Sequence, residues 1–198
     1  MTKVFLIRHG ATDWNKVHRI QGSGADPPLN EEGRRQAEML AGGLGEAEVL
    51  YSSPLLRARQ TAEFLARRRS LDVVIEPDLR EINAGVLEGV SNKDLGMTLA
   101  QYLTIPTNGD LPCPPGGESL RELQERSWRA LSRITGAHPG STIAVVSHYF
   151  VILTIICHVI GLDLLNLDRL RLDTGSVSVV RCDERSWWLG LFNATVFL

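Results

Sequence analysis

The sequence contains little cysteine and little excess charge, and both scarcities limit what the protein can be. Its 198 residues include three cysteines, Cys113, Cys157 and Cys182, none of which has CxxC spacing. A chain of this length can build its core without disulfides, so we expect a reducing compartment and a cytoplasmic protein. The formal net charge of -2 argues against nucleic acid as a partner, because such proteins neutralise phosphates with excess basic residues.

Long hydrophobic runs are also missing. The apolar run at residues 4–7 is shorter than the core of about seven residues that a secretion signal needs. The one candidate for a membrane span, residues 142–162, contains Ser147, His148 and His158, and we interpret it as a strand followed by a helix. No membrane partner is therefore expected.

Metal-binding patterns are equally scarce. His18, His138 and His158 lack the i, i+4 pairing and the neighbouring carboxylates that are typical of a metal site. We assign these three histidines to structure, and we expect neither a metal nor another cofactor.

Predicted strands and helices alternate along the chain. Short apolar runs predict strands at residues 4–7, 49–52, 73–75, 142–147, 176–181 and 187–192. Helices are expected at residues 31–44, 54–69, 120–134 and 149–160, the first three of them begun by capping side chains at Asn30, Ser53 and Ser119. The alternation predicts an α/β fold: a three-layer α/β/α sandwich whose central sheet is mostly parallel, with an antiparallel strand near the C-terminus. The length fits one domain, residues 1–198.

Cationic and imidazole side chains follow three of the predicted strands. Arg8 and His9 end the first strand, Arg57 lies in the first turns of the helix after the second, and His148 follows the strand at 142–147. The carboxyl ends of parallel strands share one edge of a sheet, so these side chains should gather there. Two arginines and two histidines near helix N-termini make a site suited to a phosphate group. Taken alone, His9 could equally be a strand-end residue that hydrogen-bonds a neighbouring carbonyl.

Several short motifs extend this pattern over most of the chain. They are Arg8-His9-Gly10-Ala11-Thr12, Trp14-Asn15, Gln21-Gly22, Ser52-Ser53-Pro54, Arg57-Ala58, Glu81, Pro115-Gly116-Gly117-Glu118-Ser119 and Ser147-His148. In order and spacing the chain resembles the histidine phosphatase superfamily, also called the phosphoglycerate-mutase-like family, from residue 4 to about residue 180.

The resemblance implies a role for each member of the predicted cluster. His9 would be the nucleophile that becomes phosphorylated, while Arg8, Arg57 and His148 would hold the phosphoryl oxygens. Glu81 would donate the proton to the leaving group. For that role its carboxyl group must hold a proton near neutral pH, so its pKa should be raised.

The resemblance also implies residues on the substrate side. Thr12, Asn15, Gln21 and Gly22 match positions that line the phosphate and leaving-group side in relatives, although for Asn15, Gln21 and Gly22 a role as loop hydrogen-bonding residues is nearly as consistent with the sequence. Tyr149 is a departure, because relatives usually carry glycine after the second histidine. Its side chain would either narrow the pocket or contribute its hydroxyl group.

Two features favour the phosphatase branch over the mutases. Mutases of this family carry Arg-His-Tyr after the acid/base glutamate, whereas Glu81 is followed by Ile82-Asn83-Ala84-Gly85. Residues 90–115 are shorter than the insertion of the mutases and are expected to form a small cap over the active site. We therefore predict a phosphatase that hydrolyses small-molecule phosphate monoesters through a phosphohistidine on His9.

The substrate and the assembly stay open at this stage. The chain length resembles that of α-ribazole phosphatases and broad-specificity phosphatases, and residues 81–86 resemble fructose-2,6-bisphosphatases, so a sugar phosphate is one option. The alternatives are a cofactor-dependent phosphoglycerate mutase and a protein that binds phosphate esters without turnover. Relatives are often dimers, and the apolar C-terminal strands could form a homodimer.

Overall fold

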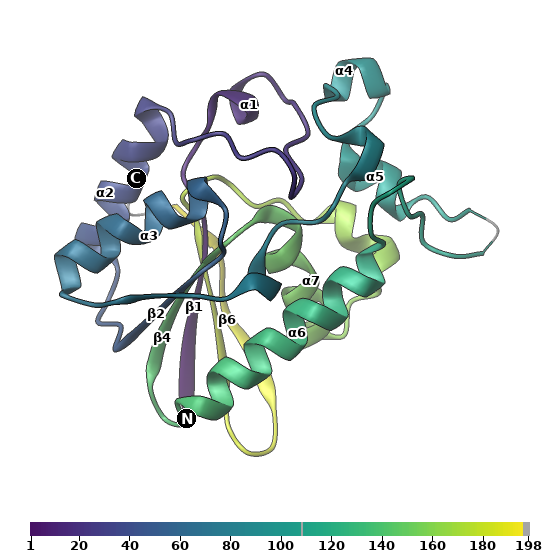
Figure 1. Ribbon diagram of the computed structural model, residues 1–198. Helices are drawn as coiled ribbons and strands as arrows, with labels where there is room; N and C mark the ends of the chain where they lie inside the picture. Colours follow the sequence, from purple (N-terminus) through teal and green to yellow (C-terminus); the bar gives the residue numbers. More distant parts are fainter. Residues whose placement is uncertain (108, 196–198) are drawn as a thin grey trace.

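A six-stranded sheet forms the centre of the computed structural model, which describes residues 1–107 and 109–195 (Figure 1). The order of the strands is β3-β2-β4-β1-β5-β6. The strands are β1 (Thr2–Arg8), β2 (Val49–Ser52), β3 (Val73–Ile75), β4 (Thr142–Ser147), β5 (Val177–Cys182) and β6 (Trp187–Ala194). Strands β1 to β4 are parallel, whereas β5 runs antiparallel to β1 and β6 antiparallel to β5. Only β5 runs against the other five strands, so the predicted α/β class, with a mostly parallel sheet and one antiparallel strand near the C-terminus, is confirmed.

Helices cover both faces of the sheet, and short helices lie above one of its edges. The α-helices are α1 (Asp13–Lys16), α2 (Glu31–Gly43), α3 (Leu56–Arg69), α4 (Asn92–Leu95), α5 (Leu99–Thr104), α6 (Leu120–Ala137) and α7 (Tyr149–Ile160). The 3-10 helices are η1 (Pro77–Leu79), η2 (Gly85–Leu87) and η3 (Leu164–Arg169). Helices α2 and α3 cover one face and α6 and α7 the other, while α1, α4 and α5 lie beyond the carboxyl ends of the parallel strands (Figure 1).

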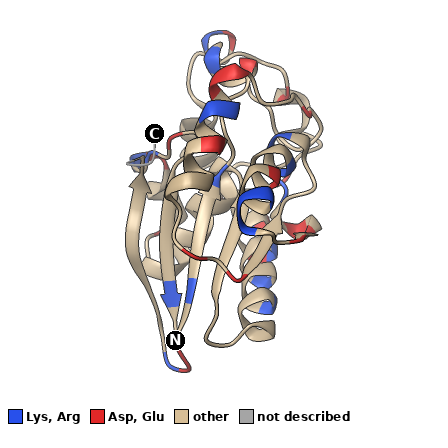
Figure 2. Ribbon diagram, turned by 90° about the vertical axis from the view of Figure 1, so that its left-hand side faces the viewer, with Lys and Arg blue, Asp and Glu red and all other residues tan. Residues whose placement is uncertain are grey.

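The central strand β1 shows why the apolar runs are continuous. Phe5 and Ile7 pack in the core under α2 and α3, and Val4 and Leu6 pack in the core under α6 and α7. A strand that is buried on both faces needs apolar residues at every position. Charged residues are accordingly scarce on the strands and gather on the helices and on the loops above the sheet (Figure 2).

One predicted helix start is wrong. Helix α3 begins at Leu56 after the N-cap residue Leu55, which makes no side-chain capping bond, and not at Ser53-Pro54. The Ser53 hydroxyl lies 2.7 Å from Nε2 of His148, so it takes part in a tertiary contact of the site. The local capping pattern of a serine before a proline was therefore overridden by the fold.

The other predicted helix starts are confirmed. Asn30 accepts from the backbone N–H of Gly33 at the start of α2, and Ser119 and Glu122 form a capping box at the start of α6. Residues 142–162 contain β4 and α7, as predicted. Within the described ranges, no helix is both long enough and apolar enough to cross a membrane.

Candidate active site

A cavity of about 470 Å³ opens beyond the carboxyl ends of β1 and β4. Arg8, His9, Arg57 and Glu81 line it, and His148 lies beneath it, fully buried. The structure thus brings the predicted cluster together from four separate segments of the chain. We call these five residues the floor of the cavity.

His9 presents a buried, neutral imidazole. Its side chain is 3% exposed, and its Nδ1 lies 2.7 Å from the carbonyl oxygen of Gly10. A carbonyl only accepts, so Nδ1 carries the hydrogen and Nε2 keeps its lone pair. Burial, followed by the positive charges of Arg57 and Arg8, holds the pKa of His9 well below its usual value. The imidazole is therefore uncharged near neutral pH.

Gly10 explains why the turn after β1 admits no larger residue. A Cβ atom at Gly10 would overlap the backbone of Gly33 at the start of α2. The Gly10 N–H also donates to the hydroxyl of Thr61 on α3 at 3.1 Å. Two helices therefore fix the backbone directly after His9.

The ring of His148 lies close to the ring of His9. The two ring centroids are 5.2 Å apart. Nε2 of His148 pairs with Ser53, while Nδ1 is buried with no hydrogen-bond partner in the described part of the chain. Burial is the main cause that keeps the pKa of His148 well below its usual value, and the charge of Arg57 adds to it.

The two arginines are held by backbone carbonyls. Arg57 donates to the carbonyls of Gly22 at 2.8 Å and Ala25 at 3.0 Å, and Arg8 donates to the carbonyl of Leu172. Burial lowers the pKa of Arg57 to about 10, so the guanidinium stays charged near neutral pH. The Nε atoms of both arginines are buried and lack a partner among the residues described. Such N–H groups are available to an anion.

Glu81 is a buried carboxyl group, 7% exposed. Its Oε1 accepts from the backbone N–H of Ile82 at 2.9 Å, and its Oε2 accepts from that of Phe150 at 3.4 Å. Burial raises the pKa of Glu81, against these bonds and the charge of Arg57. The carboxyl group is therefore shifted toward the protonated form that a proton donor needs.

Of the five residues predicted on the substrate side, four line the cavity and one does not. Asn15, Gln21, Gly22 and Tyr149 line the cavity. Thr12 does not belong to its lining: it is fully buried, and its hydroxyl accepts from the backbone N–H of Asn15 at 3.2 Å as the cap of α1.

Tyr149, which stands where relatives usually carry glycine, covers Arg8. The Arg8 guanidinium lies 5.0 Å from the centre of the Tyr149 ring, and the Tyr149 hydroxyl donates to the carbonyl of Leu170 at 3.2 Å. The hydroxyl is thus engaged with the backbone, and the ring forms part of the cavity wall beside the arginine.

Several lining residues were not predicted. The exposed residues His18, Arg19 and Arg171 also line the cavity, and we call them the rim. His18, assigned to structure from the sequence, adopts a left-handed backbone conformation with φ of 51°, and its carbonyl accepts from the Asn92 N–H at 2.9 Å. Closeness to Asn15 in the sequence is the one signal that points to His18 and Arg19, and Arg171 lies in no motif.

Part of the predicted cap also reaches the cavity. Asn92 on α4, and Thr98, Leu99 and Ala100 at the start of α5, belong to its lining. Residue 108 of the predicted cap lies outside the described residues. No group of three or more potential metal ligands occurs among the described residues.

Comparison with known proteins identifies the family. The model of the "Histidine phosphatase superfamily (branch 1)" matches residues 4–195. This chain belongs to the histidine phosphatase superfamily. The family and the enzyme class predicted from the sequence are thereby confirmed.

Individual relatives of this histidine phosphatase include both phosphatases and mutases. A "Metal-independent phosphoserine phosphatase" from Arabidopsis thaliana is 35% identical, over 94% of this chain and 79% of the relative. A "Probable phosphoglycerate mutase GpmB" from Cronobacter sakazakii is also 35% identical, over 94% and 88%. The crystal structure of a phosphoserine phosphatase from Entamoeba histolytica with 3-phosphoglyceric acid superposes with a TM-score of 0.89, at 29% identity and complete coverage of both chains.

Proposed function

We propose that this histidine phosphatase hydrolyses small phosphate monoesters whose alcohol carries a carboxylate, through a phosphohistidine at Nε2 of His9. The observation that carries the proposal is the pairing of a neutral, buried imidazole with a buried carboxyl group whose pKa is raised, in one cavity with two charged arginines. That combination supplies a nucleophile, an acid and donors for the phosphoryl oxygens.

In the first half-reaction, His9 attacks the phosphorus atom. Its Nε2 forms the N–P bond while the bond from phosphorus to the alcohol oxygen breaks, and Glu81 gives its proton to that oxygen. Charge on the phosphoryl oxygens is stabilised by Arg8 and Arg57 and by the free Nδ1–H of His148, whose Nε2 then accepts from Ser53.

In the second half-reaction, water attacks the phosphohistidine. Glu81, now a carboxylate, takes a proton from the water as the N–P bond breaks, which returns the neutral imidazole and releases inorganic phosphate. No other group on the described wall combines burial with a raised carboxyl pKa. Glu81 therefore serves in both steps, as acid and then as base.

The substrate class rests on the rim and on the relatives. Two exposed arginines, Arg19 and Arg171, line the cavity together with His18, and in this proposal they meet the alcohol part of the ester. A carboxylate there would gain charge-assisted hydrogen bonds. Similar phosphatases have been solved with phosphoserine and with 3-phosphoglyceric acid, two esters of this kind.

The remaining predicted residues have supporting parts in this proposal. Gln21, whose Oε1 is buried without a partner among the described residues, and Asn15 and Gly22 would contact the ester, while Tyr149 would shape the pocket over Arg8. Thr12 would act through the loop that it caps. Residues 90–115 would select the leaving group from above.

The test is the chemistry of the phosphoenzyme. Incubation with labelled phosphoserine should give a phosphoenzyme that is labile to acid and stable to base, and His9→Ala should give none. A phosphoenzyme stable to acid and labile to base would indicate a carboxylate and contradict the proposal. A panel of monoesters with and without a carboxylate would then test the substrate class.

A mutase is the second candidate, because "Probable phosphoglycerate mutase GpmB" sequences are among the relatives. With 3-phosphoglycerate and a bisphosphate primer, a mutase forms 2-phosphoglycerate faster than inorganic phosphate. Release of inorganic phosphate alone would eliminate this candidate. Tight binding of esters without phosphate release would instead support a binding protein.

Compartment and assembly complete the proposal. Cys113, Cys157 and Cys182 are all free thiols, which supports a reducing compartment, and the cytoplasm is our proposal. A homodimer through the edge strand β6 is proposed by analogy with relatives. Light scattering during size-exclusion chromatography would test the dimer.

A further inference from the structure

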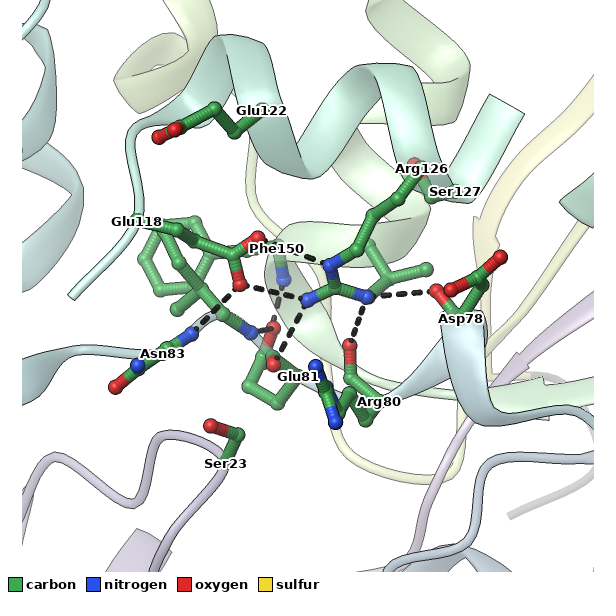
Figure 3. Close-up of polar contacts among 12 residues, drawn as sticks. Ser23, Asp78, Arg80, Glu81, Asn83, Glu118, Glu122, Arg126, Ser127 and Phe150 are labelled. Atoms are coloured by element: carbon green, nitrogen blue, oxygen red, sulfur yellow. Dashed lines mark hydrogen bonds and ion pairs between the residues drawn. The ribbon is translucent and has the colours of Figure 1, made fainter. Parts of the chain in front are cut away.

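Arg126 on α6 is buried, although it is charged and lies outside the cavity lining. All five of its N–H groups are used (Figure 3). Nε and Nη2 donate to the carboxylate of Glu118 at 2.9 and 2.8 Å. Nη2 also donates to the carbonyl of Glu81 at 3.0 Å, and Nη1 donates to those of Asp78 at 2.6 Å and Arg80 at 2.7 Å. One guanidinium therefore holds three backbone carbonyls in four successive residues.

Glu118 hydrogen-bonds to the C-terminal end of the same segment, at Asn83. Its Oε2 accepts from the backbone N–H of Asn83 at 2.9 Å, and its own backbone N–H donates to the carbonyl of Asn83 at 2.9 Å. A Cβ atom at Gly117 would overlap that carbonyl, so the close approach requires glycine. The Pro-Gly-rich motif at 115–119 therefore packs its backbone directly against the backbone at Asn83.

The segment that is held carries the proposed acid. Arg126 binds the carbonyl of Glu81 itself, and Glu118 binds the Asn83 N–H two residues later. Among the described residues, the Glu81 carboxyl group accepts hydrogen bonds only from the backbone N–H groups of Ile82 and Phe150, and none from Arg126. The place of the acid relative to His9 is therefore set by the backbone.

We propose that Arg126 and Glu118 are positioning residues, which fix the backbone from Asp78 to Asn83 so that the carboxyl group of Glu81 reaches the leaving oxygen. The proposal rests on the proposed role of Glu81 as proton donor. A planar guanidinium can bond to several fixed acceptors at once, whereas a lysine ammonium presents a single point of charge. Arg126→Lys should therefore keep the buried charge and lose the alignment.

Arg133 offers a matched control on the same helix. It forms ion pairs with Glu76 at 3.1 Å and Asp78 at 3.0 Å, next to the same segment. Its side chain is 53% exposed, and its contacts are to side chains rather than to backbone carbonyls. Arg133→Gln removes a charge close by without releasing the backbone around Glu81.

The experiment compares two leaving groups in rapid-quench assays of phosphohistidine formation. The alkoxide of phosphoserine, or of the best alkyl phosphate in the panel, needs a proton, whereas para-nitrophenolate leaves without one. Arg126→Lys should slow the alkyl ester about 10- to 100-fold at nearly unchanged KM and the aryl ester less than about 3-fold. Glu118→Gln should act in the same direction, and Arg133→Gln should slow neither ester.

A double-mutant cycle separates positioning from simple loss of structure. If Arg126 acts through Glu81, Arg126→Lys should have no further effect on the alkyl ester in the Glu81→Gln background. Equal slowing of both esters, additive effects, or unfolding of both the Arg126 and Glu118 variants would overturn the inference. If Glu81→Gln itself leaves the alkyl ester unaffected, the proposed acid fails, which is a distinct result.

Discussion

The floor and the rim of the cavity are built in opposite ways. The floor residues His9, Arg57, Glu81 and His148 are at most 7% exposed, and each has a hydrogen-bond partner that fixes its orientation. The rim residues are exposed and belong to loops. Burial is what shifts the pKa of the floor groups, since desolvation is the largest cause for each of them.

Under the proposed function, this difference places the chemistry on the floor and the choice of substrate on the rim. Buried groups with shifted pKa values are suited to bond making and proton transfer. Exposed charges are weakened by water and salt, so each contributes modestly and can change at little cost to stability. The relatives fit this division, because they include phosphatases that act on different esters.

The largest expected effect comes from the floor nucleophile. His9→Ala should lower kcat for phosphate release more than about 10³-fold, because the covalent route is lost. His18→Ala, at the rim, should leave kcat within a few-fold. Assays of phosphate release at saturating substrate measure both, and comparable losses would break the distinction between floor and rim.

The next effect concerns the floor acid and its pH dependence. Because burial raises the pKa of Glu81, the protonated acid is lost as the pH rises through that value, and the rate for alkyl esters should fall on the alkaline side. Glu81→Gln should lower the rate about 10²- to 10³-fold and abolish this alkaline decline. A pH profile of kcat/KM tests both, and a decline retained in the variant would assign it to another group.

Rim substitutions should affect binding and spare chemistry. Arg171→Ala and Arg19→Ala should each raise KM for phosphoserine roughly 2- to 5-fold, since one exposed charge pair contributes about 1 kcal/mol or less. KM for an ester without a carboxylate should stay the same. Steady-state kinetics at low and moderate salt would measure this, and a fall in kcat would place the arginines with the chemistry.

The smallest expected effect concerns how the free energy of unfolding depends on pH through His148. The pKa of His148 is lowered in the folded state, so below about pH 6.5 the unfolded chain binds more protons and stability falls as the pH falls. The slope from one such histidine is at most about 1.4 kcal/mol per pH unit. His148→Gln should reduce the slope measured by urea unfolding between pH 6.5 and 5. An unchanged slope would contradict the burial argument.

The strands and the floor could be predicted from the sequence because each leaves a local pattern. The continuous apolar runs at 4–7 and 142–147 are typical of strands buried on both faces, and His9 and His148 directly follow them. The parallel pairing of β1 with β4 brings the two histidines together. The order of the elements along the chain, with the rule that parallel strands end at one common edge of the sheet, was enough to predict that the two histidines lie together.

The rim, and the true start of α3, could not be predicted because they depend on tertiary contacts. Ser53 has the pattern of a helix cap, but its hydroxyl pairs with His148, 95 residues further along the chain. Arg171 reaches the cavity from the segment before β5, and its neighbours in the sequence carry no chemical pattern. Likewise, nothing in the motif at 115–119 reveals that it holds the loop of Glu81.

The antiparallel strand beside β1 has a consequence for how such an enzyme can diversify. Arg8 and His9 lie at the carboxyl end of β1. The segment beside them leads into β5, and its Gly175 N–H donates to the carbonyls of both residues. Part of the cavity wall is therefore formed by the segment at residues 170–175, which contains none of the five floor residues. Exchanging residues 170–175 for those of a relative should change the substrate preference while the side chains of His9, Arg57, Glu81 and His148 stay the same.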